Sequence, residues 1–232
     1  EIASRISFEA ADTTPDQALL NAAALGELLD INNIRAQVVR LLQTPHGKDK
    51  VEQGLMRWSL SVAPADIASL PAALANGLDT NALVQSMQVE MRTYIDDMVF
   101  NQKASFEALL TSKNSFASDP SLAAVYGHAP INGSTPAQFP DRRQGLLMRA
   151  PFLSSSNTRT SIIHRGVDFQ KRVLCNIIPA PSANIVDLRN QQVLTHDELL
   201  AVTNREAIEY QTASPVCMSC HFKLDPMGKA FM

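Results

Sequence analysis

The segment from Leu83 to Met98 constrains the fold most, because its apolar residues recur at the spacing of an α-helix. The repeating residues are Leu83, Met87, Met91, Ile95 and Met98. Positions three and four apart share one face of a helix, so we expect this face to be buried, with the methionines filling a core. Glu90 and Arg92 interrupt the segment. It is therefore too polar to predict a membrane span, which needs about 18 apolar residues.

Helix start signals recur in the rest of the chain, whereas strand signals are sparse. A capping residue followed by proline is typical of a helix N-terminus, and a Glu or Gln three residues after the cap completes a capping box. A cap followed by proline occurs at Thr14-Pro15-Asp16-Gln17, Asp119-Pro120 and Ser214-Pro215. Thr195-His196-Asp197-Glu198 is a capping box, and the helix that it opens is expected to reach about Gln211. Further helices are expected at about 33–43, 48–62, 106–110, 145–153 and 165–175. The sequence therefore predicts a mainly α fold.

A predicted loop divides the chain into two parts. The stretch from Ala129 to Arg142 is rich in Pro, Gly, Ser and Thr and is predicted to be a loop. We expect a helical, bundle-like N-terminal domain in residues 1–140 and a C-terminal helical region in residues 141–232.

The charge of the chain argues against one class of partner. The formal net charge is only −3, whereas phosphate binding needs a basic face, so nucleic acid is not an expected partner.

The residues with the clearest chemistry are Cys217, Cys220 and His221, in the order Cys-x-x-Cys-His. This order is the attachment signature of c-type haem. Two cysteines three apart on a helical turn can reach both vinyl groups of a porphyrin, and the next residue presents an imidazole to the iron. The motif therefore predicts one haem c per chain, with His221 as the proximal iron ligand.

Two other chemistries use the same spacing of cysteines. A thioredoxin-like dithiol opens a helix in a βαβ setting, which is missing here. A Cys₃His zinc set would be complete if Cys175 joined Cys217, Cys220 and His221. A zinc knuckle usually brings a second pair of closely spaced ligands, and Cys175 stands alone, so we expect Cys175 to be a buried free thiol.

Residues near the motif are candidates for supporting a haem. Asp225-Pro226-Met227-Gly228 is predicted to be a turn, in which the carbonyl of Pro226 accepts a hydrogen bond from the second nitrogen of His221. Arg165 and Arg149 are candidates for pairing with haem propionates, because arginine offers a bidentate fork to carboxylates. An ordinary ion pair explains each arginine equally well.

Short sequence blocks spread over nearly the whole chain point to one known pair of domains. The blocks are Ser4-Arg5-Ile6-Ser7, Pro15-Asp16, Leu19-Leu20, Arg40-Leu41-Leu42, Leu122-Ala123, Tyr126-Gly127, Arg143, Gly145-Leu146-Leu147, Phe152-Leu153, Thr160-Ser161, His164-Arg165-Gly166, Leu174-Cys175, Pro179, Pro181, Cys217 to His221, Asp225-Pro226 and Gly228. On these blocks the chain resembles the paired domains of unknown function 1592 and 1588 of large secreted bacterial cytochrome-like proteins. The resemblance implies a redox module flanked by other domains, some with further haems, and it names no substrate.

The chain departs from this pair at both ends. Phe8 is followed by Glu9-Ala10-Ala11, where the pair usually has an aromatic-rich segment. The acidic and aromatic stretch expected after Gly228 is cut off at Met232, and so few residues after His221 cannot cover a haem. We therefore expect the chain to be part of a longer protein.

Several residues are candidates for the distal iron ligand. His164 ranks first, because it belongs to one of the more specific blocks and directly precedes Arg165-Gly166, where a helix is expected to begin. It could instead merely cap that helix. The other candidates are His128, His196, Met148, Met227 and the methionines of the long helix, which are better explained as core residues.

The expected function is electron transfer by a c-type cytochrome module of a larger extracytoplasmic protein or assembly. Its partners would be a redox protein or further haem domains. Thioether attachment takes place outside the cytoplasmic membrane, so we expect a periplasmic, outer-membrane-associated or extracellular location. Two alternatives stay open: a haem-dependent oxidoreductase of the peroxidase or oxygenase kind, with an open distal side, and a structural or binding module with zinc at the cysteines.

Overall fold

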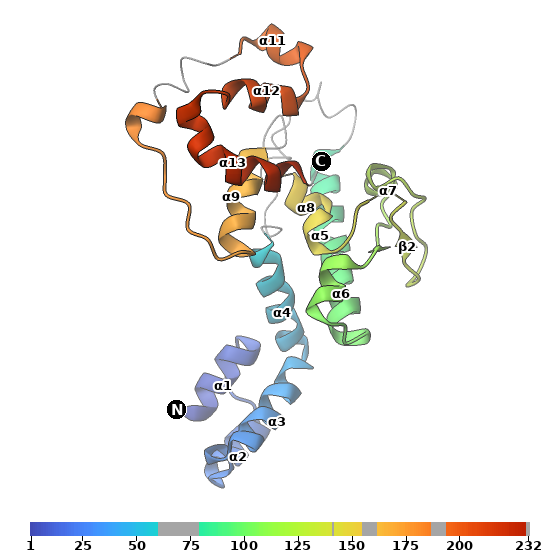
Figure 1. Cartoon of the computed structure of the whole chain (residues 1–232). Helices are drawn as coiled ribbons and strands as arrows, with labels where there is room; N and C mark the ends of the chain where they lie inside the picture. Colours follow the sequence, from blue (N-terminus) through green and yellow to red (C-terminus); the bar gives the residue numbers. More distant parts are fainter. Residues whose placement is uncertain (60–78, 141, 155–161, 187–193, 231–232) are drawn as a thin grey trace. The chain divides into compact units, whose positions relative to one another are not determined.

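The computed structural model describes residues 1–59, 79–140, 142–154, 162–186 and 194–230 (Figure 1). It confirms the mainly α fold. Internal contacts divide the chain into two units, Glu1–Val62 with Ser86–Leu146, and Ala63–Gln85 with Leu147–Met232, called unit 1 and unit 2 below. Within the described ranges, every helix is too short or too polar to cross a membrane.

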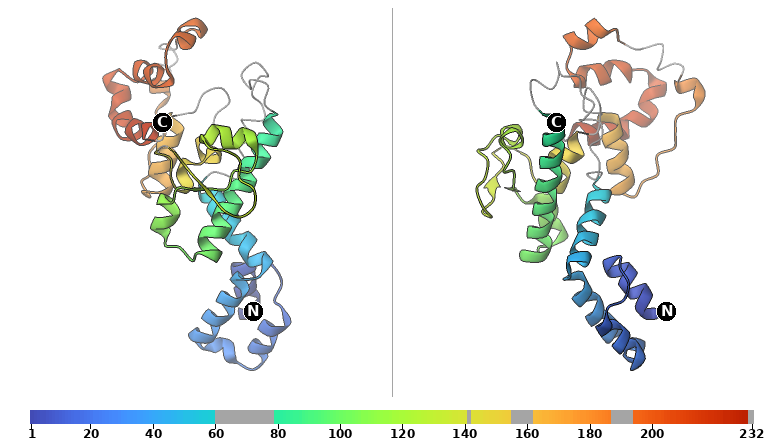
Figure 2. Two further views of the ribbon diagram at one scale, coloured as in Figure 1. Left: turned by 90° about the vertical axis from the view of Figure 1, so that its right-hand side faces the viewer. Right: turned by 180° about the vertical axis from the view of Figure 1, so that it is seen from behind.

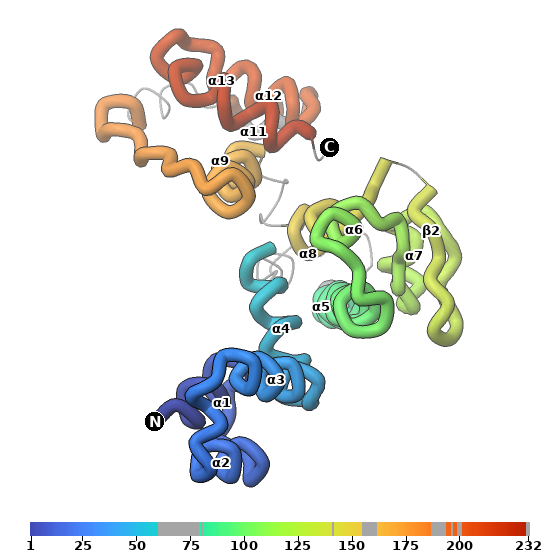
Figure 3. The backbone as a smooth tube through the Cα atoms, turned by 60° about the horizontal axis from the view of Figure 1, so that its bottom comes forward, coloured from blue at the N-terminus to red at the C-terminus, as the bar shows by residue number. Residues whose placement is uncertain are grey.

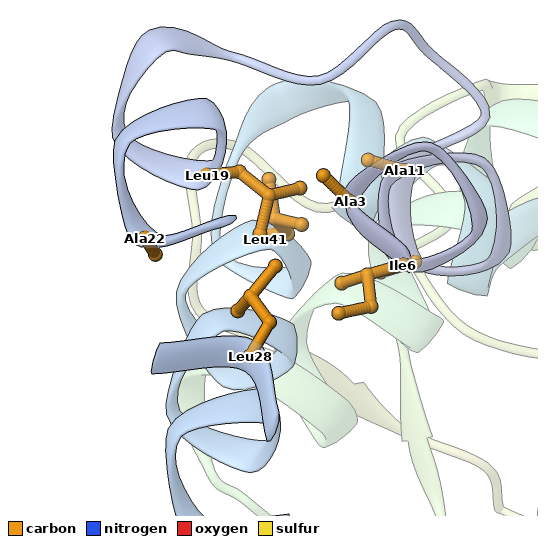
Figure 4. Close-up of a cluster of buried hydrophobic side chains, with 8 residues drawn as sticks. Ala3, Ile6, Ala11, Leu19, Ala22, Leu28 and Leu41 are labelled. Carbon is orange, nitrogen blue, oxygen red and sulfur yellow. The ribbon is translucent and has the colours of Figure 1, made fainter. Parts of the chain in front are cut away.

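The N-terminal part of unit 1 is a group of short helices around an apolar cluster. The elements are α1 (Ile2–Ala11), α2 (Gln17–Ala24), the 3₁₀ turn η1 (Glu27–Leu29), α3 (Ile31–Leu42) and α4 (Pro45–Trp58). In Figure 4, Leu19, Leu28 and Leu41 converge with Ile6 of α1, and all four side chains are buried. Removal of these side chains from water holds the short helices together, because isolated helices of this length are marginal in water.

Two local expectations for this region were wrong. Helix α1 was not predicted, and no side chain caps its first turn. The cap of α2 is Asp16 rather than Thr14, since the Asp16 carboxylate accepts the N–H of Leu19 and also forms an ion pair with Arg40 at 2.6 Å. One carboxylate therefore both starts α2 and connects it to α3.

The rest of unit 1 is built on the helix predicted from the apolar repeat. Its elements are α5 (Thr80–Asp96), which continues as the π-helical turn η2 (Asp97–Asn101), then α6 (Phe106–Thr111), β1 (Asn114–Ser115), α7 (Pro120–Tyr126) and β2 (Ala137–Gln138). Met91, Ile95 and Met98 are buried in one cluster with Leu109 and Phe116, which confirms the methionines as core residues. The antiparallel pairing of β1 with β2 lies partly within the predicted loop.

Glu90 is a buried acid on α5, although the sequence showed it only as a break in the apolar pattern. Its side chain accepts the backbone N–H of Phe116 at 3.1 Å and the hydroxyl of Tyr126 at 3.5 Å. A buried acceptor that meets such donors escapes most of the cost of desolvation. Glu90 therefore ties α5 to the segment around β1 and to α7.

Unit 2 contains the predicted C-terminal helices, with two changes. Its elements after the 3₁₀ turn η3 (Leu146–Met148) are α8 (Ala150–Leu153), α9 (Ile162–Arg172), α11 (His196–Ala201), α12 (Asn204–Gln211) and α13 (Pro215–Lys229). The helix expected from Thr195 to Gln211 is two helices, because a second capping box at Thr203 and Glu206 starts α12. The second change is in α13, which continues through Pro226, where a turn was predicted. Figure 2 shows this last helix in red.

Candidate functional site

Helix α13 begins where the sequence predicted and carries all three motif residues. Ser214 caps it by accepting the N–H of Cys217, and Pro215 occupies the first turn. Cys217 is buried and Cys220 is exposed, and both are free thiols. The side chain of His221 is 19% exposed, so part of the ring is open to solvent.

The turn predicted at Asp225-Pro226 is wrong, because α13 runs through Pro226 to Lys229. Proline removes one backbone donor from a helix but does not always end it. The carbonyl of Pro226 accepts the N–H of Ala230 within this helix, so the role predicted for it toward His221 is also wrong. Its place is taken by Asp225, whose Oδ1 lies 2.8 Å from Nδ1 of His221.

The carboxylate of Asp225 is held from two sides. Asp225 is buried, with a side chain only 8% exposed. Its Oδ2 lies 3.4 Å from the hydroxyl of Thr212, which follows α12 directly and whose single proton has a nearer acceptor in the carbonyl of Ile208 at 2.8 Å. The ring of His221 therefore meets a fixed acceptor rather than a mobile surface acid.

Two glycines bring α9 and α13 into backbone contact (Figure 3). A Cβ atom on Gly166 of α9 would overlap the carbonyl oxygen of Leu224, and one on Gly228 of α13 would overlap that of Ile162. Both close approaches fall beside Asp225, on the preceding and following turns of α13. Only glycine permits this spacing, so the pair of glycines fixes the helix that carries the motif.

Arg165 is part of the same helix contact. It is 2% exposed, and its guanidinium donates to the carbonyls of Gly228 at 3.4 Å and Leu153 at 3.3 Å. Burial lowers the pKa of Arg165. Arg149, its fellow candidate for propionate binding, is fully buried. The structure thus gives Arg165 a structural role between α9, α13 and the end of α8, because a buried guanidinium needs such acceptors.

The sequence predicted His164 at the start of a helix. In the structure α9 begins earlier, at Ile162, so His164 lies inside the helix, with an exposed side chain. It sits between Ile162 and Gly166, the residues that meet Gly228 and Leu224. This places it level with the C-terminal half of α13, beyond the Cys217 to His221 turns. Its role as distal ligand stays a prediction.

The other distal candidates have varied surroundings. Both ring nitrogens of His128 are hydrogen-bonded in unit 1, one to the carbonyl of Ala129 and the other to the hydroxyl of Ser115. Met148 and Met227 are half-buried. The side chain of His196 lies outside the described part of the structure.

Cys175 is an exposed free thiol, so the expectation that it is buried was wrong. It has a left-handed backbone, with φ 56°, and follows α9. The N–H of Asn176 bonds back to the carbonyl of Gln170 in α9. Cys175 therefore lies in the turn that follows the end of α9 at Arg172. Among the described residues, no three His, Cys, Asp or Glu side chains converge as they would to hold a metal ion.

Large apolar side chains are exposed around the motif. Met218 and Phe222, one turn apart on α13, are 40% and 55% exposed, and Val216 is 40% exposed. Tyr210 on α12 is 60% exposed. An apolar porphyrin would remove such side chains from water, so the surroundings of the motif fit a haem as well as its donor atoms do.

Comparisons with known proteins find families but no characterised relative. A family model described as PSD4, a protein of unknown function (DUF1592), matches residues 1–128. A second, described as PSCyt3, a protein of unknown function (DUF1588), matches residues 143–232 and so contains α9 and α13. No curated protein and no solved structure matches the chain. The chain therefore belongs to the DUF1592 family, with a DUF1588 region following in the same chain.

Proposed function

We propose that α13 carries one haem c, bound through Cys217 and Cys220 and ligated by His221, and that the chain transfers electrons. The main observation behind the proposal is the hydrogen bonding of the two ring nitrogens of His221. Nδ1 faces the carboxylate of Asp225, and none of the described residues hydrogen-bonds Nε2. A metal-binding histidine typically has this arrangement, with one nitrogen held by an acceptor and the other left for the metal.

The two thiols supply the attachment. Each S–H adds across one vinyl C=C bond, so that a C–S bond forms, the hydrogen moves to the neighbouring vinyl carbon, and no electrons are gained or lost. Once bound, haem supplies a one-electron couple between ferric and ferrous iron. The chain positions this couple by the rigid contact of α9 with α13.

A zinc site is the weaker explanation of the same residues. A structural zinc ion takes four ligands. Cys175, the residue needed to complete the set, is exposed at the end of α9, and no described group of three ligands forms. Haem needs only one iron ligand from this helix, which His221 can supply.

The setting of the module is part of the proposal. Because thioethers are made outside the cytoplasmic membrane, we place the protein in the periplasm, at the outer membrane or outside the cell. Its electrons would come from a reduced redox protein or a neighbouring haem domain and pass to an oxidised one. A larger protein or assembly would supply these partners.

The pair of His221 and Asp225 also favours a second candidate, a haem-dependent oxidoreductase. A carboxylate partner makes the proximal imidazole a stronger donor. A strong sixth ligand would favour electron transfer, whereas an open distal position would favour catalysis. Binding of cyanide by the ferric protein without displacing a protein ligand would support the second candidate.

The attachment is tested by intact mass. We expect the chain, produced in a periplasm with haem-attachment enzymes, to keep one haem after denaturation and acid-acetone extraction. A Cys217→Ser/Cys220→Ser variant is the matched control and should lose it. Bare polypeptide mass in the wild type, with zinc in metal analysis, would contradict the proposal.

A further inference from the structure

We propose that Asp225 is the positioning residue of the proximal ligand, which fixes the tautomer of His221 and lowers the reduction potential of the iron. The inference rests on the proposed function and deepens it. It begins with the distance of 2.8 Å between Oδ1 of Asp225 and Nδ1 of His221. An ionised carboxylate can only accept a hydrogen bond, so in the neutral ring Nδ1 carries the proton and Nε2 is the nitrogen with a free lone pair.

The helix brings the two side chains together. His221 and Asp225 are four residues apart and lie on one face of α13. The carbonyl of Pro226 accepts the N–H of Ala230 along the helix, and the partner of Nδ1 of His221 is Asp225. Asp225 is therefore the group on this helix that orients the imidazole.

Burial strengthens the interaction. The side chains of His221 and Asp225 are 19% and 8% exposed, so little water competes for the hydrogen bond. The backbone contacts of Gly166 with Leu224 and of Gly228 with Ile162 hold the turns on either side of Asp225. These contacts fix the backbone from which the carboxylate of Asp225 projects toward His221.

The negative charge of Asp225 determines the direction in which it changes the reduction potential. A negative acceptor on Nδ1 raises the electron density of the imidazole and favours ferric over ferrous iron. A neutral amide at the same position would keep the geometry and remove most of this effect. The proposed sign is therefore a lower potential with aspartate than with asparagine.

The first experiment needs no haem. In the unloaded wild-type protein, ¹⁵N NMR of the histidine ring should show the Nδ1–H tautomer at His221. A dominant Nε2–H tautomer would overturn the role of Asp225. This readout also separates the two proposals, because it decides on Asp225 even if the protein never takes up haem.

The second experiment measures the potential of the haem-loaded protein. In Asp225→Asn the ferric-to-ferrous equilibrium should shift about tenfold toward ferrous iron, or about 59 mV for one electron. Where the ferrous iron is five-coordinate, its iron–histidine stretching frequency should fall as well. The matched control is Asp49→Asn on α4, whose carboxylate pairs with Arg92 in unit 1, and it should change neither value. Unchanged values in Asp225→Asn would overturn the inference.

Thr212→Val provides a variant that keeps the carboxylate in place. The His221–Asp225 pair itself is unchanged in this variant, so the Nδ1–H tautomer of His221 should persist in the unloaded protein. A dominant Nε2–H tautomer in Thr212→Val would contradict the role of Asp225.

Discussion

Glu90 in unit 1 and Asp225 in unit 2 are both buried carboxylates on helices, 1% and 6% exposed, and they differ in what they face. The partners of Glu90 are the amide of Phe116 and the hydroxyl of Tyr126, groups of the protein core. The partner of Asp225 is the imidazole of His221, inside the Cys-x-x-Cys-His motif. Burial of an acid therefore does not mark a functional site by itself, whereas the chemistry of its partner does.

The comparison predicts that the two acids depend on different packing. In Gly228→Ala the added Cβ atom collides with the carbonyl oxygen of Ile162 and pushes α13 away from α9. This change is close to Asp225 in α13 and should leave the surroundings of Glu90 as they are. Overpacking against backbone should cost about 3 kcal/mol or more of the stability of unit 2. Denaturant unfolding would measure this loss, and the tautomer of His221 should become mixed.

Gly54→Ala is the control for Gly228→Ala. Gly54 lies in α4, and a Cβ there meets no atom within 4 Å. This variant should be neutral or stabilising by up to about 1 kcal/mol, because alanine favours helices. If Gly228→Ala and Gly54→Ala changed the free energy of unfolding equally, the close backbone contact of Gly228 with α9 would be contradicted.

A smaller loss of stability is expected at Glu90. Glu90→Ala leaves the N–H of Phe116 and the hydroxyl of Tyr126 without this acceptor, which should destabilise unit 1 by about 2 kcal/mol. Glu90→Gln keeps an acceptor oxygen and should cost less. Haem content and potential should stay at the wild-type values in both variants. A changed potential in either one would break the contrast between Glu90 and Asp225.

The smallest effect belongs to an exposed acid, Asp16. The hydrogen bond from Arg40 lowers its pKa below the ordinary value of 3.8. A lowered pKa in the folded state means that the stabilisation is complete above that ordinary value and is lost as the pH falls through the folded pKa. Both side chains are more than a third exposed, so the contribution should stay below about 1 kcal/mol.

Asp16→Asn checks this sign, since asparagine also caps helices well. Urea unfolding of the wild type and the variant at several pH values should show a small difference at neutral pH that shrinks in acid. A difference that grows as the pH falls would contradict the assignment.

Local signals explain most of what the sequence predicted correctly. The caps at Asp119, Thr195 and Ser214 start the helices expected of them, because a cap acts within one turn. The apolar repeat gave α5 and its buried methionines for the same reason. The second capping box at Thr203 was present in the sequence and would have divided the long predicted helix.

The environment of His221 was predicted incorrectly because Pro226 was taken as the end of the helix. With α13 continued through Pro226, the spacing of His221 and Asp225 alone would have paired them. The structural role of Arg165 and the contacts of Gly166 and Gly228 depend on the packing of α9 on α13, which no local pattern encodes.

The most direct measurement is a pyridine haemochrome spectrum of the purified wild-type chain beside its Cys217→Ser and Cys220→Ser variants. We expect a spectrum with both vinyl groups saturated in the wild type. Each single variant should show the red-shifted band of a haem with one remaining vinyl group. A wild-type chain without a haemochrome band, after production with haem-attachment enzymes, would contradict the claim that α13 is a haem helix.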